Sequence, residues 1–185
     1  MTHHSPSINL IAAVAVDGSI GAKGNLLWKI PADLKFYKAK TLDNVVVIGE
    51  ATFDTLPRVA LKNRTHVVVS KKYSEMEPYP EEEQLENVFY MPNPKEALKK
   101  AFQLAGDKGC DVFVGGGQSI YEQLIQHCDF LFLTWVDKVF VDVADTHFPI
   151  IDIMNHFELI SESKWHGKHA KAYPPYKFTV YKNRG

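Results

Sequence analysis

The sequence predicts an α/β protein whose central sheet is mostly parallel and has an antiparallel edge. Short apolar runs rich in β-branched residues alternate with segments of helical pattern along most of the chain. Two further strand-like runs near the C-terminus are typical of an antiparallel hairpin. With 185 residues, 45% of them hydrophobic and 23% charged, the chain has the size and composition of one globular domain, residues 1–185.

The N-terminal half is expected to alternate strand and helix. Its first run is apolar almost throughout, which indicates a strand covered on both faces, and Asp17-Gly18-Ser19 ends it. Pro31 suits a first helical position, because its fixed φ and missing N–H cost nothing there. Pro57 stops a later short helix. The expected elements are strand 8–16, helix 31–42, strand 44–48, short helix 51–56 and strand 65–70.

The C-terminal half repeats the alternation after one long surface loop. Residues 71–86 are expected to form that loop, because six glutamates and two prolines oppose packing. Asn93-Pro94 starts the next helix, and Gly115-Gly116-Gly117 separates a strand from a helix. The expected elements are strand 88–91, helix 94–105, strand 111–115, helix 118–126, strand 129–136 and the paired strands 157–163 and 176–181.

Composition and charge argue against several classes of protein. A formal net charge of −1 gives no broad basic field, so nucleic acid is not expected as a partner. The apolar runs have strand length, which predicts no membrane span, and residues 1–7 lack the apolar core of a signal peptide. Cys110 and Cys128 favour free thiols in a reducing cytoplasm over a disulfide. His3-His4 and His166-Gly167-Lys168-His169 have no companion ligands, so no metal site is expected.

The segment from Gly24 to Tyr37 is the strongest candidate for a binding site. Asp33 falls in the first turn of the expected helix, and Phe36 and Tyr37 share its face. A carboxylate beside two rings indicates a partly dry site for a flat, cationic or amidine-like ligand. The alternative is structural, because acidic residues complement helix dipoles and aromatic residues pack in cores.

Two glycine turns are candidates for phosphate contacts. Gly115-Gly116-Gly117 and Gly49 each lie between a strand and a helix, where a backbone can approach a phosphate closely. Ile120 stands where the dinucleotide fingerprint needs glycine or alanine, so an ordinary Rossmann interpretation fails. Glu50 opposes an anion at the second turn, and tight turns without a ligand remain the alternative.

Several motifs in register resemble dihydrofolate reductase. The matching segments cover essentially the whole chain in the family's order: residues 10–21, 25–34, 48–57, 115–121 and 145–149. The resemblance implies that hydride passes from NADPH to C6 of dihydrofolate while N5 gains a proton, giving tetrahydrofolate for one-carbon metabolism. It also implies that Asp33 pairs with the pterin amino group and ring N3, favouring protonation at N5, and that Thr134 hydrogen-bonds this carboxylate. Arg64 matches the arginine that clamps the glutamate tail of folate.

The site residues implied by the resemblance fall into three sets. The catalytic set is Asp33, Trp28 and Leu26. The substrate set is Ala13, Asp33, Leu34, Tyr37, Leu61, Arg64 and Thr134. The cofactor set is Ala13, Ile20, Gly49, Ala51, Thr52, Ser70, Lys71, Gly116, Gly117, Gln118, Ser119, Ile120 and Tyr121.

Three departures from the family pattern bear on this interpretation. Leu27 replaces the usual proline before the tryptophan, which predicts a less rigid loop over the site. Gly115 replaces a bulky aliphatic residue, which predicts extra space near the pterin and nicotinamide. Glu50 and Ala51 stand where basic side chains usually grip the cofactor's phosphates, so NADH is an alternative cofactor unless Lys71 compensates.

Two rival functions and the expected partners complete the prediction. One rival is a riboflavin-pathway reductase of the same fold, and the other is a catalytically silent folate-binding protein. The partners implied are dihydrofolate and antifolates such as methotrexate or trimethoprim, acting on a cytoplasmic monomer with no nucleic-acid or membrane partner.

Overall fold

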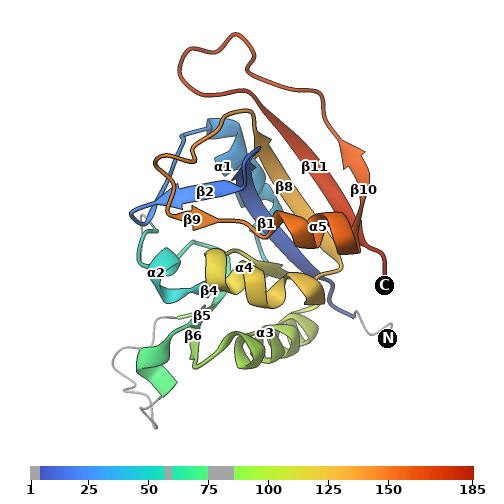
Figure 1. The fold of residues 1–185 in the computed structure, drawn as a ribbon. Helices are drawn as coiled ribbons and strands as arrows, with labels where there is room; N and C mark the ends of the chain where they lie inside the picture. Colours follow the sequence, from blue (N-terminus) through green and yellow to red (C-terminus); the bar gives the residue numbers. More distant parts are fainter. Residues whose placement is uncertain (1–4, 57–59, 75–85) are drawn as a thin grey trace.

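The computed structural model describes residues 5–56, 60–74 and 86–185. Eight strands form one sheet in the order β10-β11-β8-β1-β7-β4-β5-β6 (Figure 1). Strands β1, β4, β5, β6, β7 and β8 pair in parallel, whereas β11 is antiparallel to both β8 and β10. The prediction of a mostly parallel sheet with an antiparallel C-terminal edge is therefore confirmed, with β10 outermost. The strands are β1 Ile8–Ala15, β4 Val45–Gly49, β5 Thr65–Val69, β6 Val88–Met91, β7 Val112–Val114, β8 Phe130–Val136, β10 Phe157–Glu162 and β11 Tyr176–Asn183.

Helices cover both faces of this sheet. On one face, α3 packs Ala97, Ala101 and Ala105 at four-residue spacing against the buried valines of the central strands. On the other face, α1 and α2 contribute Phe36 and Phe53 to a second apolar cluster. Figure 1 shows α3, α4 and α5 on one side of the sheet and α1 on the other. The helices are α1 Pro31–Thr41, α2 Glu50–Phe53, α3 Pro94–Lys108, α4 Gln118–Leu124 and α5 Ile150–His156, with single 3₁₀ turns η1 Lys71–Ser74 and η3 Ile125–His127.

Some elements differ from those expected. A small antiparallel sheet of β2 (Ser19–Ala22), β3 (Asn25–Leu26) and β9 (Thr146–His147) was not predicted, because strands of two to four residues carry no periodic signal. Helix α5 was also missed. Helix α3 runs three residues beyond its predicted end, to a left-handed Gly109 (φ 66°) that caps it. Of the predicted loop 71–86, Lys71–Ser74 forms η1 and residues 75–85 lie outside the described part of the chain.

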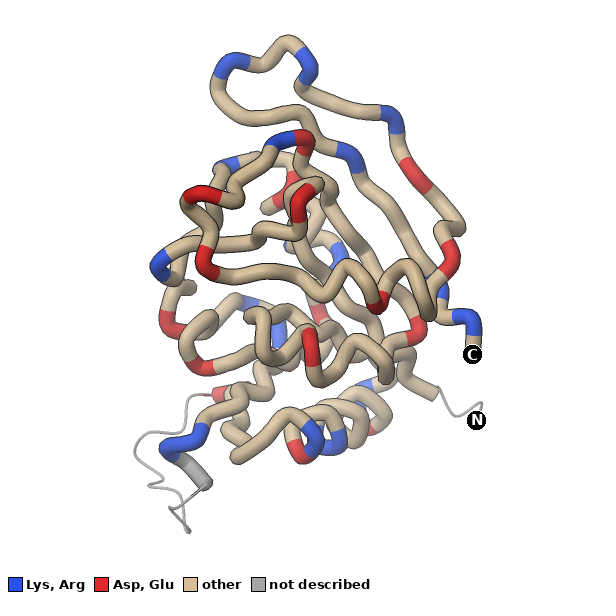
Figure 2. Tube along the Cα trace, viewed as in Figure 1, with Lys and Arg blue, Asp and Glu red and all other residues tan. Residues whose placement is uncertain are grey.

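Successive side chains of β1 point to opposite faces of the sheet. Leu10, Ala12 and Val14 join the cluster packed by α3 and α4, whereas Ile11 and Ala13 face the side covered by α1. The carboxyl ends of the parallel strands meet at one edge, where open α/β sheets bind ligands. Both signs of charge are spread over the molecule (Figure 2). Among the described helices, none combines the length and apolarity needed to cross a membrane.

Candidate active site

Two glycine turns meet at the carboxyl ends of neighbouring strands β4 and β7. The backbone N–H of Gly49 donates to the carbonyl oxygen of Gly116 over 2.7 Å, and the N–H of Gly115 donates to the carbonyl of Val47 over 2.8 Å. The peptide between Gly116 and Gly117 is cis. These bonds bring the start of α2 next to the start of α4, so the two turns that the sequence singled out form one feature.

The glycines at this feature leave no room for side chains. Gly116 has φ 102°, and a Cβ there would lie 2.7 Å from the hydroxyl oxygen of Tyr121. A Cβ on Gly117 would lie 2.9 Å from Oγ1 of Thr52 on α2. The Tyr121 hydroxyl itself donates to the carbonyl of Ile11 on β1 over 3.0 Å. The turn is therefore bare backbone held between α2, α4 and β1.

Asp33 is a buried carboxylate on the α1 side of the sheet. It is 9% exposed, and no ion pair joins its carboxylate to another described residue. Burial raises the pKa of the Asp33 carboxyl above its usual value, and the nearby Thr134 hydroxyl opposes this shift. Thr134 is the register partner of Ala13 across β8 and β1. A buried carboxylate without an ion-pair partner is costly, which is typical of a group kept for a ligand.

The Thr134 hydroxyl lies close to the Asp33 carboxyl, but the two groups do not meet the geometric criteria of a hydrogen bond. The hydroxyl lies near enough to affect the carboxyl pKa, but Thr134 Oγ1 is buried and has no partner at hydrogen-bond geometry. Both groups therefore keep bonding capacity for a ligand or a water molecule.

Two tyrosines lie within electrostatic reach of Asp33, since burial, with a contribution from the charge of Asp33, raises the pKa of Tyr121 and of Tyr176. Elsewhere on α1, the ring of Phe36 packs on that of Phe178 with centroids 4.5 Å apart. Burial raises the pKa of Tyr37 to about 12, and it raises the pKa of Tyr121 as well, with smaller contributions from Tyr37 and Asp33. Tyr121 therefore lies within electrostatic reach of both Tyr37 and Asp33 in a space of low polarity.

Trp28 and two leucines form the outer part of the site. The Trp28 indole is buried against Phe140, and its Nε1 has no hydrogen-bond partner. Leu26 and Leu34 are 56% and 59% exposed. Leu26 and Leu34 precede and follow Trp28 in the chain and offer exposed apolar side chains that suit contact with a flat ring.

Arg64 is a buried arginine at the C-terminal end of α1, with 9% of its surface exposed. Its Nε donates to Oγ1 of Thr41 over 2.8 Å, and its two terminal nitrogens donate to the carbonyls of Lys62 and Lys38 at 3.2 and 3.4 Å. A guanidinium carries five N–H donors, so these bonds fix its plane and leave about two donors for a carboxylate. Leu61 is partly buried nearby in sequence.

The remaining cofactor candidates are distributed around the glycine turns. Ser70 follows β5, and its buried Oγ has no partner. Glu50, at the start of α2, pairs with Lys72 at 3.1 Å, whereas Ala51 and Lys71 are exposed. On α4, Ile120 packs in the core, Ser119 bonds Gln123, and the Gln118 side chain accepts from the N–H of His147 over 2.8 Å. Ile20 packs in the same core cluster.

The extra space predicted at Gly115 is already filled. A Cβ on Gly115 would meet Cγ1 of Val46 at 3.1 Å and the Tyr37 hydroxyl at 3.2 Å. The prediction of an enlarged pocket at this position is therefore wrong, because the Tyr37 hydroxyl occupies the volume of the missing side chain. Sequence order could not show this, since the two residues come from α1 and the end of β7.

Several contributors to the site were missed at the sequence level. Phe178 on β11 stacks with Phe36, and the carbonyl of Ile11 orients Tyr121. Lys72 forms an ion pair with Glu50, which the sequence did not predict. Within residues 5–56, 60–74 and 86–185, no group of three His, Cys, Asp or Glu side chains is placed to hold a metal ion. Cys110 and Cys128 are free thiols.

Known proteins resemble this chain over nearly its full length. A family model described as dihydrofolate reductase matches residues 7–183. Dihydrofolate reductase type 9 of Escherichia coli is 39% identical over 132 residues, which is 70% of each chain. Dihydrofolate reductase type 3 of Salmonella typhimurium is 37% identical over 142 residues, covering 77% of this chain and 78% of that one. A solved structure of the Enterococcus faecalis dihydrofolate reductase, complexed with NADP(H) and RAB-propyl, superposes with a TM-score of 0.78 at 30% identity and covers 98% of both chains.

Proposed function

The chain belongs to the dihydrofolate reductase family, and on that premise we propose that it reduces dihydrofolate to tetrahydrofolate with NADPH, using Asp33 to hold the pterin. The observation that carries the proposal is the buried carboxylate of Asp33, which forms no ion pair with a described residue and whose pKa is raised by burial. NADPH supplies the hydride. The chain's own residues orient the two rings, exclude water and favour a proton at N5.

Asp33 acts by pairing with the flat, basic edge of the pterin. A carboxylate in a dry site forms strong charge-assisted bonds to an amino group and a ring N–H. Burial raises the pKa of Asp33 because it disfavours the charged carboxylate. A basic ring that pairs with this carboxylate therefore reduces the cost of the buried charge. The paired ring becomes more basic, which helps N5 to gain its proton as hydride reaches C6. Trp28 Nε1 and Thr134 Oγ1 supply further hydrogen bonds, either directly or through water.

Arg64 holds the carboxylate tail of the substrate. Its bonds to Thr41, Lys62 and Lys38 fix the guanidinium plane before the substrate arrives. A preorganised guanidinium pairs with a carboxylate through two parallel bonds and loses little side-chain entropy on binding. Leu34 and Leu61 are the apolar side chains that we assign to the region between this clamp and Asp33.

The glycine turns and α2 hold the cofactor. Bare backbone at Gly49, Gly116 and Gly117 permits a close approach of the pyrophosphate, and Thr52 contributes a hydroxyl there. Ser70 and Lys71 are assigned to the 2′-phosphate side. The ion pair between Glu50 and Lys72 lowers the cost of a carboxylate near the cofactor's phosphates, which is compatible with NADPH as the cofactor.

The proposed function also implies which inhibitors the enzyme binds, its oligomeric state and its cellular compartment. Methotrexate and trimethoprim carry flat diamino heterocycles, which suit a buried carboxylate, so we expect both to compete with dihydrofolate. A monomer that forms one domain and works in the cytoplasm is the simplest form of the enzyme, in keeping with two free thiols.

Steady-state oxidation of NADPH tests the proposed function. The enzyme should consume NADPH only when dihydrofolate is present and should release tetrahydrofolate in equal amounts. Turnover of a ribosylaminopyrimidine instead would favour the riboflavin-pathway reaction. Tight methotrexate binding without NADPH oxidation would favour a silent binding protein.

A further inference from the structure

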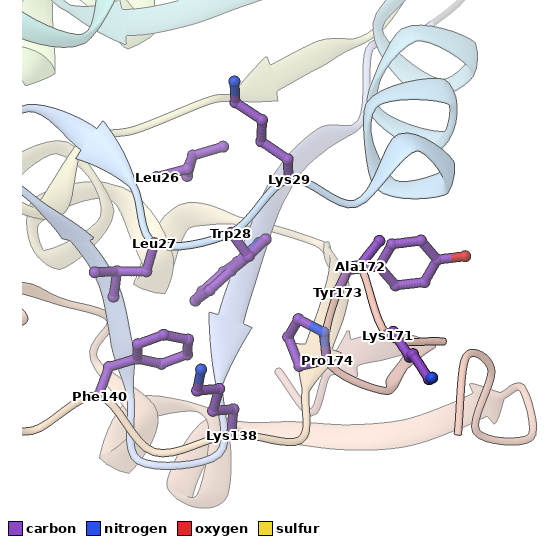
Figure 3. Close-up of a pocket in the computed structure, with 10 residues that line it drawn as sticks. All are labelled: Leu26, Leu27, Trp28, Lys29, Lys138, Phe140, Lys171, Ala172, Tyr173 and Pro174. Carbon is purple, nitrogen blue, oxygen red and sulfur yellow. The ribbon is translucent and has the colours of Figure 1, made fainter. Parts of the chain in front are cut away.

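A separate cavity lies where three loop segments meet, outside the site assigned above. Its volume is about 540 Å³, within the range of about 300–1,000 Å³ typical of small-molecule pockets. Its walls come from Leu26–Lys29, from Lys138 and Phe140, and from residues 171–174 of the β10–β11 connection (Figure 3). Asp33, Arg64 and the glycine turns do not line it. Leu26 and Trp28 form the wall that this cavity shares with the outer part of the active site.

The cavity has aromatic walls. Trp28 and Phe140 pack with ring centroids 5.5 Å apart and an angle of 47° between their planes. Tyr173 and Pro174 form the opposite side. Trp28 and Phe140 are 6% and 8% exposed, so a ligand ring would contact only the small exposed parts of these side chains, where contact adds to the burial of apolar surface.

The charges at the cavity all have the same sign. Lys29, Lys138 and Lys171 line it, and the lining contains no aspartate or glutamate. In Figure 3 the Lys138 ammonium lies beside Phe140 and faces Trp28, whereas Lys29 and Lys171 extend outward on opposite sides. The Lys138 Nζ lies 5.1 Å from the centroid of the Phe140 ring. Within the described residues no ion pair joins these three lysines to a carboxylate.

The neighbouring β10–β11 connection strengthens this positive character. Residues 163–177 contain four lysines and two histidines without any acidic residue. Figure 2 shows the lysine positions, in blue, spaced along the connection. Lys177 is paired with Glu162 at 2.6 Å, and Lys171 is the lysine of this connection that lines the cavity. Like charges around a concave surface focus a field that attracts an anion.

We propose that this cavity binds a small aromatic anion, such as an aryl carboxylate or sulfonate. The ring lies against Trp28 and Phe140, and the anionic group lies between Lys138 and the flexible ammonium groups of Lys29 and Lys171. Long lysine side chains reach an anion at the rim by changing rotamer, and Lys29 and Lys171 extend outward from the cavity in Figure 3. Because Trp28 forms a wall of both sites, an occupant contacts the loop that covers the active site. The inference does not depend on the proposed reaction.

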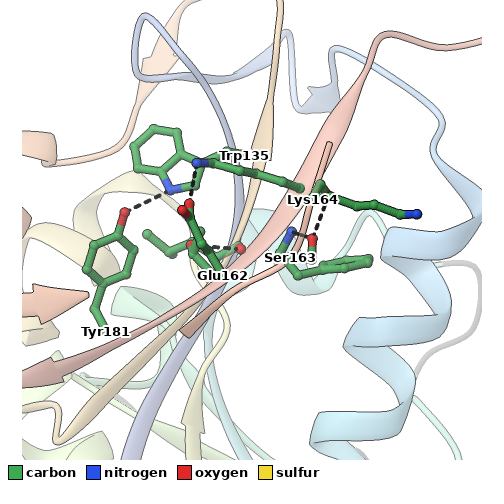
Figure 4. A network of polar contacts seen from close by, with 9 residues as sticks. Trp135, Glu162, Ser163, Lys164 and Tyr181 are labelled. Atoms are coloured by element: carbon green, nitrogen blue, oxygen red, sulfur yellow. Dashed lines mark hydrogen bonds and ion pairs between the residues drawn. The ribbon is translucent and has the colours of Figure 1, made fainter. Parts of the chain in front are cut away.

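The test uses naphthalenesulfonate as the probe and naphthol as its uncharged counterpart. Binding is followed by the NMR signals of the three tryptophan indole N–H groups. Trp135 provides an internal reference, because its indole donates to the Tyr181 hydroxyl over 3.2 Å on β8 and β11, away from the cavity lining (Figure 4). We expect naphthalenesulfonate to shift the Trp28 signal in a saturable manner and to leave the Trp135 signal in place.

Two exposed lysines allow a matched comparison of variants. The double variant Lys138→Gln, Lys171→Gln should bind the sulfonate on the order of tenfold more weakly, because two favourable charges are lost. The control Lys95→Gln, Lys99→Gln removes the same charge from exposed positions of α3 and should bind as the parent does. Unchanged indole spectra without probe will show that both variants are folded. The proposal would be overturned if the parent bound naphthol as tightly as naphthalenesulfonate, or if the Lys138→Gln, Lys171→Gln variant bound the sulfonate as tightly as the parent. A Trp28 signal that does not move on addition of the sulfonate would also overturn it.

Discussion

The backbone N–H of Gly49 donates to the carbonyl oxygen of Gly116 over 2.7 Å, which joins the end of β4 to the turn after β7. Gly49 also lies close to α4, since a Cβ on Gly49 would lie 3.2 Å from Cγ1 of Ile120. Helix α2 begins at the next residue, so this bond fixes Glu50 and Thr52 relative to α4. The proposed cofactor site therefore depends on backbone geometry at two glycines.

Replacing Gly116 with alanine should destabilise the fold and weaken NADPH binding. Its φ of 102° is strained for any residue with a Cβ, and that atom would overlap the Tyr121 ring and hydroxyl. We expect a loss of about 2 kcal/mol or more in the free energy of unfolding, measured with urea. The control is Gly106→Ala in α3, where the nearest atom lies 3.9 Å from the added Cβ and helix propensity favours alanine. Equal effects of the two substitutions would contradict this account of the turn.

Glu50→Gln should improve the use of NADPH more than that of NADH. The substitution removes a negative charge at the start of α2 and releases Lys72 from its 3.1 Å ion pair. Because the two cofactors differ by one phosphate, the KM for NADPH should fall about two- to fivefold at low salt, and the change should shrink as salt is added. Glu96→Gln, in the first turn of α3, is the matched control. Equal changes in both KM values would mean that Glu50 does not influence the 2′-phosphate side.

Arg64→Lys should raise the KM for dihydrofolate while leaving NADPH binding unchanged. Lysine keeps the charge but loses the planar fork that Thr41, Lys62 and Lys38 hold in place. We expect an increase of roughly tenfold or more in KM. Thr41→Val provides a second comparison, because it removes the acceptor of Arg64 Nε and should raise KM by a smaller factor. An unchanged KM in Arg64→Lys would remove Arg64 from the substrate site.

His66 should make the fold sensitive to acid. Its ring is fully buried on β5 against Phe53, and neither nitrogen has a partner. Burial, assisted by the charge of Arg64, lowers the pKa of His66 from 6.5 to about 4. Below pH 6.5 the unfolded chain therefore binds a proton that the folded chain excludes, and the free energy of unfolding falls until about pH 4.

The linked loss of stability for His66 amounts to about 3 kcal/mol over that interval. Urea unfolding of the parent and of His66→Leu at several pH values measures it, since the variant lacks this proton uptake. His127→Leu, at an exposed position, should keep the pH dependence of the parent. Parallel stability curves for the parent and His66→Leu would show that His66 is not the acid-sensitive group.

The sequence was most informative where local chemistry determines structure. Runs such as Val45–Ile48 and Val67–Val69 predicted buried strands, and Pro31 and Asn93 marked helix starts that the structure confirms. The order of Asp33, Phe36 and Tyr37 predicted a carboxylate in a partly dry site, and Asp33 is buried, with 9% of its surface exposed.

Features that depend on contacts distant in sequence could not be predicted. The bonds that hold Arg64 come from α1, up to 26 residues earlier in the chain. The space at Gly115 is filled by the Tyr37 hydroxyl, and no pattern in either segment indicates that they meet. The small sheet of β2, β3 and β9 is held by a few backbone bonds between segments too short to show periodicity.

The central claim is that Asp33 is the charged group that binds and activates the pterin. Its most direct test is kcat/KM for dihydrofolate at neutral pH in Asp33→Asn, beside Asp107→Asn, an exposed position on α3. We predict a loss on the order of a hundredfold or more for Asp33→Asn, with NADPH affinity retained and with greater stability of the ligand-free protein, because a buried charge is removed. Asp107→Asn should match the parent. Parental kcat/KM in a folded Asp33→Asn variant would contradict the account.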